Sequence, residues 1–205
     1  NLSTPGFIEL RGVSDRGLGI GTKKWEPDGG PVPGVRINIR TPAMYKPNTV
    51  YSFLDYNSSK DVKNISVVTS DDTGKISFSV NHENHQIGIF KKNDPADLVC
   101  LAYQVNGNSQ FFDHNKESAL AIRLLNRGGS EAKGIKVTLK TSTSGVVIAN
   151  PVLETGRLGS GEVHWLSGDF KITASNTPAR DGSPFRVRFN LIITDDKQQI
   201  WQDDL

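Results

Sequence analysis

The chain has 205 residues, of which 36% are hydrophobic and 22% are charged, with 24 lysines and arginines against 22 aspartates and glutamates. This composition is typical of a globular protein and excludes a collagen-like chain, a disulfide-stapled miniprotein and a fully disordered tail. The near-neutral charge balance argues against a dedicated nucleic-acid-binding protein, which needs a strongly basic surface. No run of about 18 apolar residues occurs, so the sequence predicts no membrane span.

Apolar and polar residues alternate along several segments, as they do in half-buried antiparallel strands. The clearest of these segments are residues 35–40, 76–80, 135–140 and 185–193. Residues 117–125 contain good helix formers, but their apolar side chains at 120, 122 and 124 also alternate, so we predict a strand there. The sequence therefore predicts an all-β chain.

Polar turn residues predict two hairpins. Residues 72–75 would join a strand at 67–69 to one at 76–78, and residues 195–198 would join 191–193 to 199–201.

A polar stretch with a proline, residues 91–97, separates two apolar runs and is typical of an exposed connection between domains. We therefore expect two tandem immunoglobulin-like β-sandwich domains, residues 1–94 and 95–205. The first 34 residues are rich in glycine and proline. They predict an irregular lead-in to the first domain, which is either a long loop or a strand that completes a domain whose rest is missing.

The second half follows a pattern of hairpins and turns at Asn126–Ala132, Ile135–Leu139, Leu158–Glu162, Phe170–Thr173 and Phe189–Asp203. In these motifs it resembles CARDB-like bacterial immunoglobulin-like domains over about residues 98–205. The resemblance implies an immunoglobulin-like fold and an accessory role in a secreted, periplasmic or cell-surface bacterial protein.

The first half has looser motifs at residues 51–56, 70–78 and 85–89. They resemble a small β-domain found beside the catalytic domain of secreted bacterial esterase-like or glycoside-hydrolase-like proteins. The resemblance implies a non-catalytic part of such an enzyme. No catalytic residue carries over, because the hydrolase motifs do not occur in this chain.

Two residues of the sequence could in principle act as nucleophiles. Ser130 lies in Gly128–Ala132, which lacks the last glycine of a nucleophile elbow and sits between two strands, so we predict a structural turn. Cys100 is the only cysteine and lies in an apolar run, which predicts a buried, inert thiol.

Four residues are weak candidates for metal ligands. His82 and His85 are three apart, and in a strand their side chains would point to opposite faces. Asp55 and Asp61 bound a loop with oxygen ligands at alternate positions, but the loop departs from the calcium-binding pattern of an EF-hand. We expect structural roles for all four, and we expect no metal and no cofactor.

Other acidic and glycine-rich motifs have simpler structural explanations. The aspartate pairs at 71/72, 195/196 and 203/204 could each contribute to a calcium loop, but aspartate is also a common turn residue. The glycines of residues 17–21 lack the spacing of a dinucleotide-binding loop.

Exposed aromatic side chains would suit a carbohydrate ligand, because pyranose rings stack on their flat faces. Trp25 has polar neighbours on both sides and is the best candidate, followed by Trp165 and Tyr56.

Three hypotheses follow. The leading one is a non-catalytic accessory or interaction module that positions a neighbouring domain or a surface partner. The second is a carbohydrate-binding module. The third is the C-terminal fragment of a secreted esterase or glycoside hydrolase, in which residues 11–34 or His82 and His85 contribute to the rim of an active site.

Overall fold

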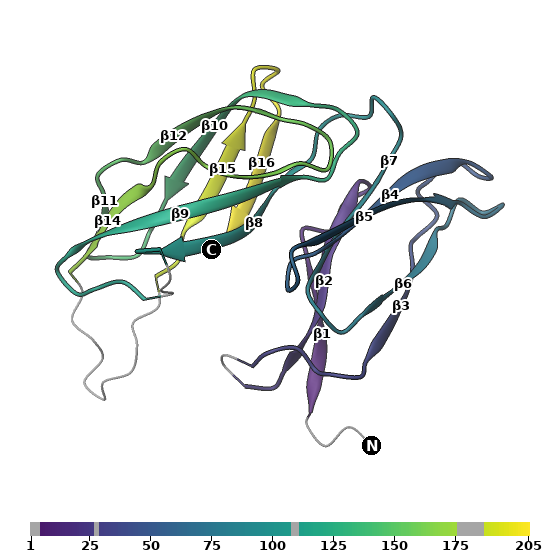
Figure 1. Ribbon diagram of the computed structural model, residues 1–205, viewed down its shortest axis with the longest axis horizontal. Coiled ribbons are helices and arrows are strands. Elements are labelled where there is room, and N and C mark those ends of the chain that lie inside the picture. Colours follow the sequence, from purple (N-terminus) through teal and green to yellow (C-terminus); the bar gives the residue numbers. More distant parts are fainter. Residues whose placement is uncertain (1–4, 27–28, 108–110, 176–186) are drawn as a thin grey trace. The chain divides into compact units, whose positions relative to one another are not determined.

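The computed structural model describes residues 5–26, 29–107, 111–175 and 187–205, and its strands are labelled in Figure 1. The described residues form sixteen strands and no helix, so the prediction of an all-β chain is confirmed. The chain divides into two compact units, Asn1–Asp97 with Arg127–Ser130, and Leu98–Asn126 with Glu131–Leu205. None of the described residues belongs to a helix that is long and apolar enough to cross a membrane.

The first unit has two antiparallel sheets, one in the order β1-β2-β7-β4-β5 and one formed by β3 and β6. The strands are β1 (Gly6–Arg11), β2 (Gly17–Lys24), β3 (Arg36–Arg40), β4 (Val50–Asn57), β5 (Val62–Thr69), β6 (Ser77–Asn81) and β7 (His85–Phe90). Side chains of both sheets share one buried core: Leu18, Ile20, Ile37, Tyr51, Phe53, Ile76, Val80, Ile87 and Ile89. The alternation seen in the sequence thus buries one face of each sheet, as in a β-sandwich.

The predicted hairpin across residues 72–75 is wrong. Strand β5 pairs with β4, whereas β6 pairs with β3 in the other sheet. The turn between them carries the chain from one layer to the next, because Val68 on β5 and Phe78 on β6 pack against the same core from opposite sheets. Asp71 stabilises this turn by accepting hydrogen bonds at Oδ1 from the backbone N–H groups of Thr73 and Lys75.

The predicted irregular lead-in is wrong for residues 6–11 and 17–24, which form β1 and β2, whereas residues 12–16 and 29–34 lie outside the strands. Gly17, Gly19 and Gly21 lie on one face of β2, where successive odd positions share a side. A Cβ at Gly19 would lie 2.9 Å from the Gln86 side-chain nitrogen, and one at Gly17 would collide with the Ile87 carbonyl oxygen. These glycines serve close packing between β2 and β7.

The second unit also has two antiparallel sheets, one in the order β12-β10-β15-β16 and one in the order β11-β14-β9-β13, with β8 paired to β9. Its strands are β8 (Leu98–Val105), β9 (Glu117–Asn126), β10 (Ala132–Lys140), β11 (Val146–Ile148), β12 (Val152–Leu158), β13 (Val163–Trp165), β14 (Phe170–Ala174), β15 (Asn190–Thr194) and β16 (Ile200–Asp204). Both sheets bury alternating apolar side chains, among them Ile122, Phe170, Val137 and Leu191. This arrangement is consistent with a second β-sandwich.

Two sequence predictions in this unit are confirmed. Residues 117–126 form strand β9 rather than a helix, and β15 pairs with β16 in a hairpin whose turn is closed by Asp195. The predicted strand at 185–193 is shorter than expected, because β15 begins at Asn190. Residues 185 and 186 lie outside the described part of the chain.

Candidate functional site

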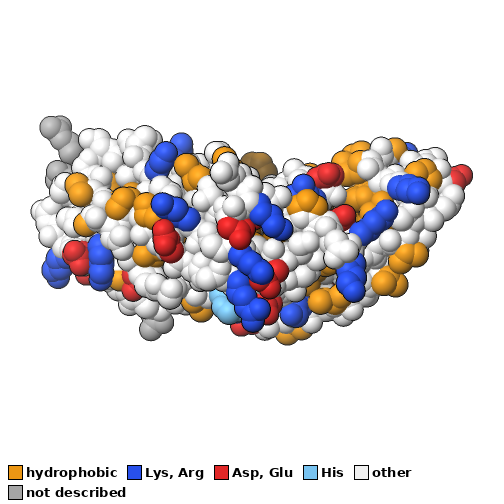
Figure 2. Space-filling view, turned by 90° about the horizontal axis from the view of Figure 1, so that it is seen from above, with side chains coloured by type: hydrophobic (Ala, Val, Ile, Leu, Met, Phe, Trp, Pro, Cys, Tyr) orange, Lys and Arg blue, Asp and Glu red, His pale blue; other side chains and the backbone are white. Residues whose placement is uncertain are grey.

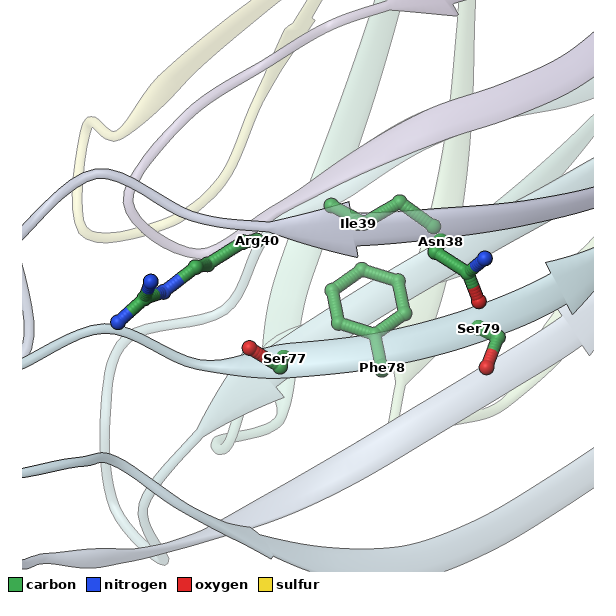
Figure 3. A pocket seen from close by; sticks show the side chains of 6 residues that line it. All are labelled: Asn38, Ile39, Arg40, Ser77, Phe78 and Ser79. Atoms are coloured by element: carbon green, nitrogen blue, oxygen red, sulfur yellow. The ribbon is translucent and has the colours of Figure 1, made fainter.

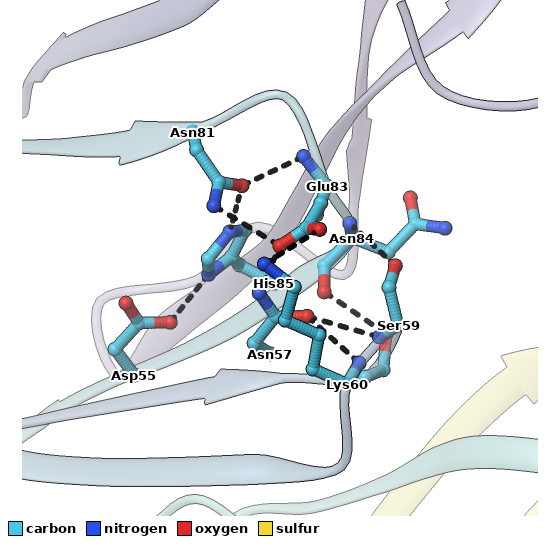
Figure 4. A network of polar contacts seen from close by, with 9 residues as sticks. Asp55, Asn57, Ser59, Lys60, Asn81, Glu83, Asn84 and His85 are labelled. Carbon is cyan, nitrogen blue, oxygen red and sulfur yellow. Dashed lines mark hydrogen bonds and ion pairs between the residues drawn. The ribbon is translucent and has the colours of Figure 1, made fainter. Parts of the chain in front are cut away.

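A network of polar side chains gathers where β4, β6 and β7 end or begin, and it contains two of the predicted site residues (Figure 4). Asp55 lies on β4, and His85 is the first residue of β7. Asn57 is the register partner of His85, which brings the β4 side chains of this network beside the start of β7. The short turn of residues 82–84 joins β6 to β7 and supplies Glu83.

His85 is buried, and both of its ring nitrogens face oxygen atoms. Nδ1 lies 2.6 Å from Asp55 Oδ1, and Nε2 lies 2.8 Å from Asn81 Oδ1. Asn81 Oδ1 also accepts a hydrogen bond from the Glu83 backbone N–H, while Asn81 Nδ2 donates to the Glu83 carboxylate. Both edges of the imidazole ring are therefore engaged by side chains of the network. Because both ring nitrogens contact protein oxygens, neither is open to a metal ion in this arrangement.

The Glu83 carboxylate contacts three groups that carry positive charge or polarised N–H bonds. Its carboxylate accepts hydrogen bonds from Asn57 Nδ2 at 2.6 Å and from Asn81 Nδ2 at 3.0 Å, and Lys60 Nζ lies 3.0 Å away. The Asn57 hydrogen bond contributes most, followed by Lys60, and together these contacts lower the pKa of Glu83 to about 2. The carboxylate is therefore ionised at neutral pH and fastens the 82–84 turn to β4.

The four weak metal candidates do not form one site. The structure brings Asp55 and His85 together, but Asp61 instead accepts a hydrogen bond from the Tyr56 hydroxyl. His82 is held through its backbone carbonyl, which accepts hydrogen bonds from the N–H and the hydroxyl of Thr22. Among the described residues, no group of three or more His, Cys, Asp or Glu side chains could hold a metal ion.

The three aromatic candidates lie in different environments. Trp25 is 73% exposed and packs edge to face with Phe7, the ring centroids lying 5.7 Å apart. Trp165 is 39% exposed, and the Arg123 guanidinium lies 5.9 Å from its ring centroid. Tyr56 is only 3% exposed, so its ring is covered and offers no face on which a sugar could stack. Trp25 is the most accessible of the three.

The remaining motifs have structural roles. The Lys75 and Thr73 donors, with Arg40, hold the pKa of Asp71 well below its usual range. Asp195 caps its hairpin turn in the same way, by accepting the backbone N–H of Gln199. Burial, with Asp203 nearby, raises the pKa of the Cys100 thiol to about 12, so this cysteine is not an activated nucleophile.

A buried ion pair in the first unit has no counterpart in the sequence predictions. Arg127 is 3% exposed, and its Nε lies 2.6 Å from Asp97 Oδ2. Its other nitrogens donate to Gln86 Oε1 at 3.3 Å and to the Gly12 carbonyl oxygen at 2.8 Å. Gly88 makes room for this segment, since a Cβ there would collide with the Arg127 carbonyl oxygen. Residues 127–130, which overlap the turn predicted from the sequence, thus belong to the first unit.

Charged side chains of both signs are interspersed over the face drawn in Figure 2. This face shows no broad stripe of one sign of the kind that nucleic-acid backbones require. Comparison of the sequence with protein-family models and with curated proteins finds no match.

Proposed function

We propose that the chain is a non-catalytic interaction module of a secreted, periplasmic or cell-surface bacterial protein. In this proposal two tandem immunoglobulin-like β-sandwiches position a neighbouring domain or a partner. The resemblance of residues 98–205 to CARDB-like domains supports the setting. The burial of His85, whose ring nitrogens are both occupied, favours a structural over a catalytic role for the Asp55–His85 pair.

One observation carries the interaction role: the five-stranded sheet has apolar side chains exposed along both of its edges. On β1 these are Phe7, Ile8 and Leu10, and on β5 they are Val62, Ile65 and Val67. Proteins usually protect edge strands with charges, prolines or a covering segment. Exposed apolar side chains on an edge strand mark a place where another polypeptide packs or adds a strand.

Strand β5 offers the more complete edge. Ile65 and Val67 are 55% and 70% exposed and lie on the same face of the strand, because they are two residues apart. Lys63 is the one charged residue of β5. We therefore assign β5 as the partner-binding edge, and the partner as an extended segment with apolar side chains at alternate positions.

Site-specific photocrosslinking in cells that produce the parent protein tests this assignment. A photoreactive residue at Thr69, on the same face of β5 as Ile65 and Val67, should give a discrete crosslinked species, and one at the exposed Lys116 should not. The double substitution Ile65→Lys and Val67→Lys should abolish the species while leaving the melting temperature nearly unchanged, because both side chains are exposed. Equal crosslinking from both positions, or turnover of ester or glycoside substrates by the purified chain, would contradict the proposal.

Carbohydrate binding is the second candidate function, and the exposure of Trp25 favours it. The indole is held by its perpendicular contact with Phe7 while most of its surface is open to solvent. A braced, exposed indole is suited to stacking on a pyranose ring, because little side-chain freedom is lost on binding.

Neutral oligosaccharides should change the tryptophan fluorescence if this candidate is right. Trp25→Ala should then weaken binding by about tenfold, whereas Trp165→Ala should leave it unchanged because Trp165 is less exposed and lies against Arg123. Equal affinities for the wild type and the Trp25→Ala variant would exclude Trp25 as the platform.

A further inference from the structure

The outer face of the β3–β6 sheet is a polar surface that the proposed function does not use. Arg36, Asn38 and Arg40 alternate along β3 with Ile37 and Ile39, which pack toward the core. Across the sheet, Asn38 is opposite Ser79, and Arg40 is opposite Ser77. An open groove of about 340 Å³ crosses this face (Figure 3). Its lining consists of Asn38, Ile39, Arg40, Ser77, Phe78 and Ser79.

The two arginines flank the groove and are held in place at one nitrogen each. Arg36 Nη2 donates to Ser79 Oγ at 3.0 Å, and Arg40 Nη2 donates to Asp71 Oδ2 at 2.9 Å. A guanidinium has five N–H donors, so most of the donors of each side chain stay available. Holding the side chains in advance lowers the entropy that a ligand must overcome.

The other polar groups of the groove are also suited to an acceptor-rich ligand. The side chains of Asn38 and Ser77 make no hydrogen bond to other described residues. The Ser79 hydroxyl accepts from Arg36, so its own O–H is free to donate. No acidic residue lines the groove. Asp71, whose carboxylate contacts Arg40, is not part of the lining.

We propose that this groove binds the carboxylate-bearing sugars of an acidic polysaccharide. Guanidinium groups bind carboxylates through strong, charge-assisted hydrogen bonds, while the amide and hydroxyl groups between them suit sugar hydroxyls. The Cα atoms of Arg36 and Arg40 are about 13 Å apart along the strand, which exceeds one pyranose ring and fits an oligosaccharide. An acidic peptide is the less favoured occupant, because the side chains of Asn38, Ser77 and Ser79 between the arginines match the dense hydroxyl groups of a sugar.

Titration of the intact chain with tetragalacturonate tests the proposal. The acid form should bind. Rising salt concentration should weaken this binding, because the arginine and carboxylate charges are exposed to solvent and are screened by ions. The same tetrasaccharide with its carboxyl groups methyl-esterified should not bind detectably. In NMR spectra, the side-chain amide of Asn38 should shift with the acid form. Equal binding of the ester, or of poly-glutamate at matched charge, would overturn the proposal.

Substitutions locate the site. Arg36→Gln and Arg40→Gln should each weaken tetragalacturonate binding by about tenfold. Arg157→Gln is the matched control, because its side chain is 76% exposed and belongs to the second unit; it should change the affinity less than twofold. The β5 variant Val67→Lys and the variant Trp25→Ala should bind like the wild type, so failure of this inference is separable from failure of the proposed function. Unchanged affinity in both arginine variants would refute the site.

Discussion

Replacing Arg127 with alanine should lower the free energy of unfolding of the first unit by about 3–5 kcal/mol. The guanidinium is buried and makes a 2.6 Å contact with the Asp97 carboxylate, which is itself 7% exposed. Its removal leaves a buried negative charge without its cation, and it takes a donor from Gln86 and from the Gly12 carbonyl. Breaking one half of a buried ion pair costs more than the intact pair contributes, because the remaining charge cannot be resolvated.

This loss of stability can be measured by chemical unfolding, with hydrogen exchange of the β2 and β7 amides as the probe. These amides report on the first unit alone. Arg157→Ala is the control: its ion pair with Glu131 is 3.6 Å long and its side chain is 76% exposed, so it should cost at most about 0.5 kcal/mol. Replacing both Arg127 and Asp97 with apolar residues should recover part of the loss. A loss below about 1 kcal/mol for Arg127→Ala would show that water reaches the pair.

The alternation of apolar residues predicted the strands well, because it depends on neighbours within one segment. Ile135, Val137 and Leu139 are buried at alternate positions of β10, as their pattern requires. Pairing between strands was predicted less well. The turn at residues 71–75 looks like a hairpin turn, yet whether its strands pair is decided by competition from β3 and β4. That competition involves residues distant in sequence.

The same distinction holds for the site residues. The contact of His85 with Asp55 joins residues that are 30 apart, and the contact of Arg127 with Asp97 spans a similar separation. No local motif marks either pair. The sequence does contain a hint that the segment at Arg127 is closely packed. Two glycines follow this residue between two apolar strands, and such glycines indicate that another backbone segment approaches closely. The alternating polar positions of residues 36–40 were also visible, but the sequence does not show that β6 supplies the opposing serines.

Replacing His85 with alanine should lower the free energy of unfolding of the first unit by about 3 kcal/mol. The imidazole fills a buried position and joins Asp55 on β4 to Asn81 at the end of β6. Without it, Asp55 and Asn81 each lose a polar contact, and a cavity replaces the ring. His82→Ala is the matched control in the same turn. Its side chain is half-buried and makes no hydrogen bond to other described residues, so the loss should be under about 1 kcal/mol.

Zinc distinguishes this structural role from the metal site that His82 and His85 first suggested. A metal that binds the folded chain would raise its melting temperature with increasing concentration. Added zinc should leave the melting temperature unchanged in the wild type and in His85→Ala, because both nitrogens of His85 already contact protein oxygens. A zinc-dependent rise that disappears in His85→Ala would instead require the ring to leave Asp55 or Asn81. In that case His85 would be a metal ligand that the network covers when no metal is bound, and its role in joining β4 to β6 would be secondary.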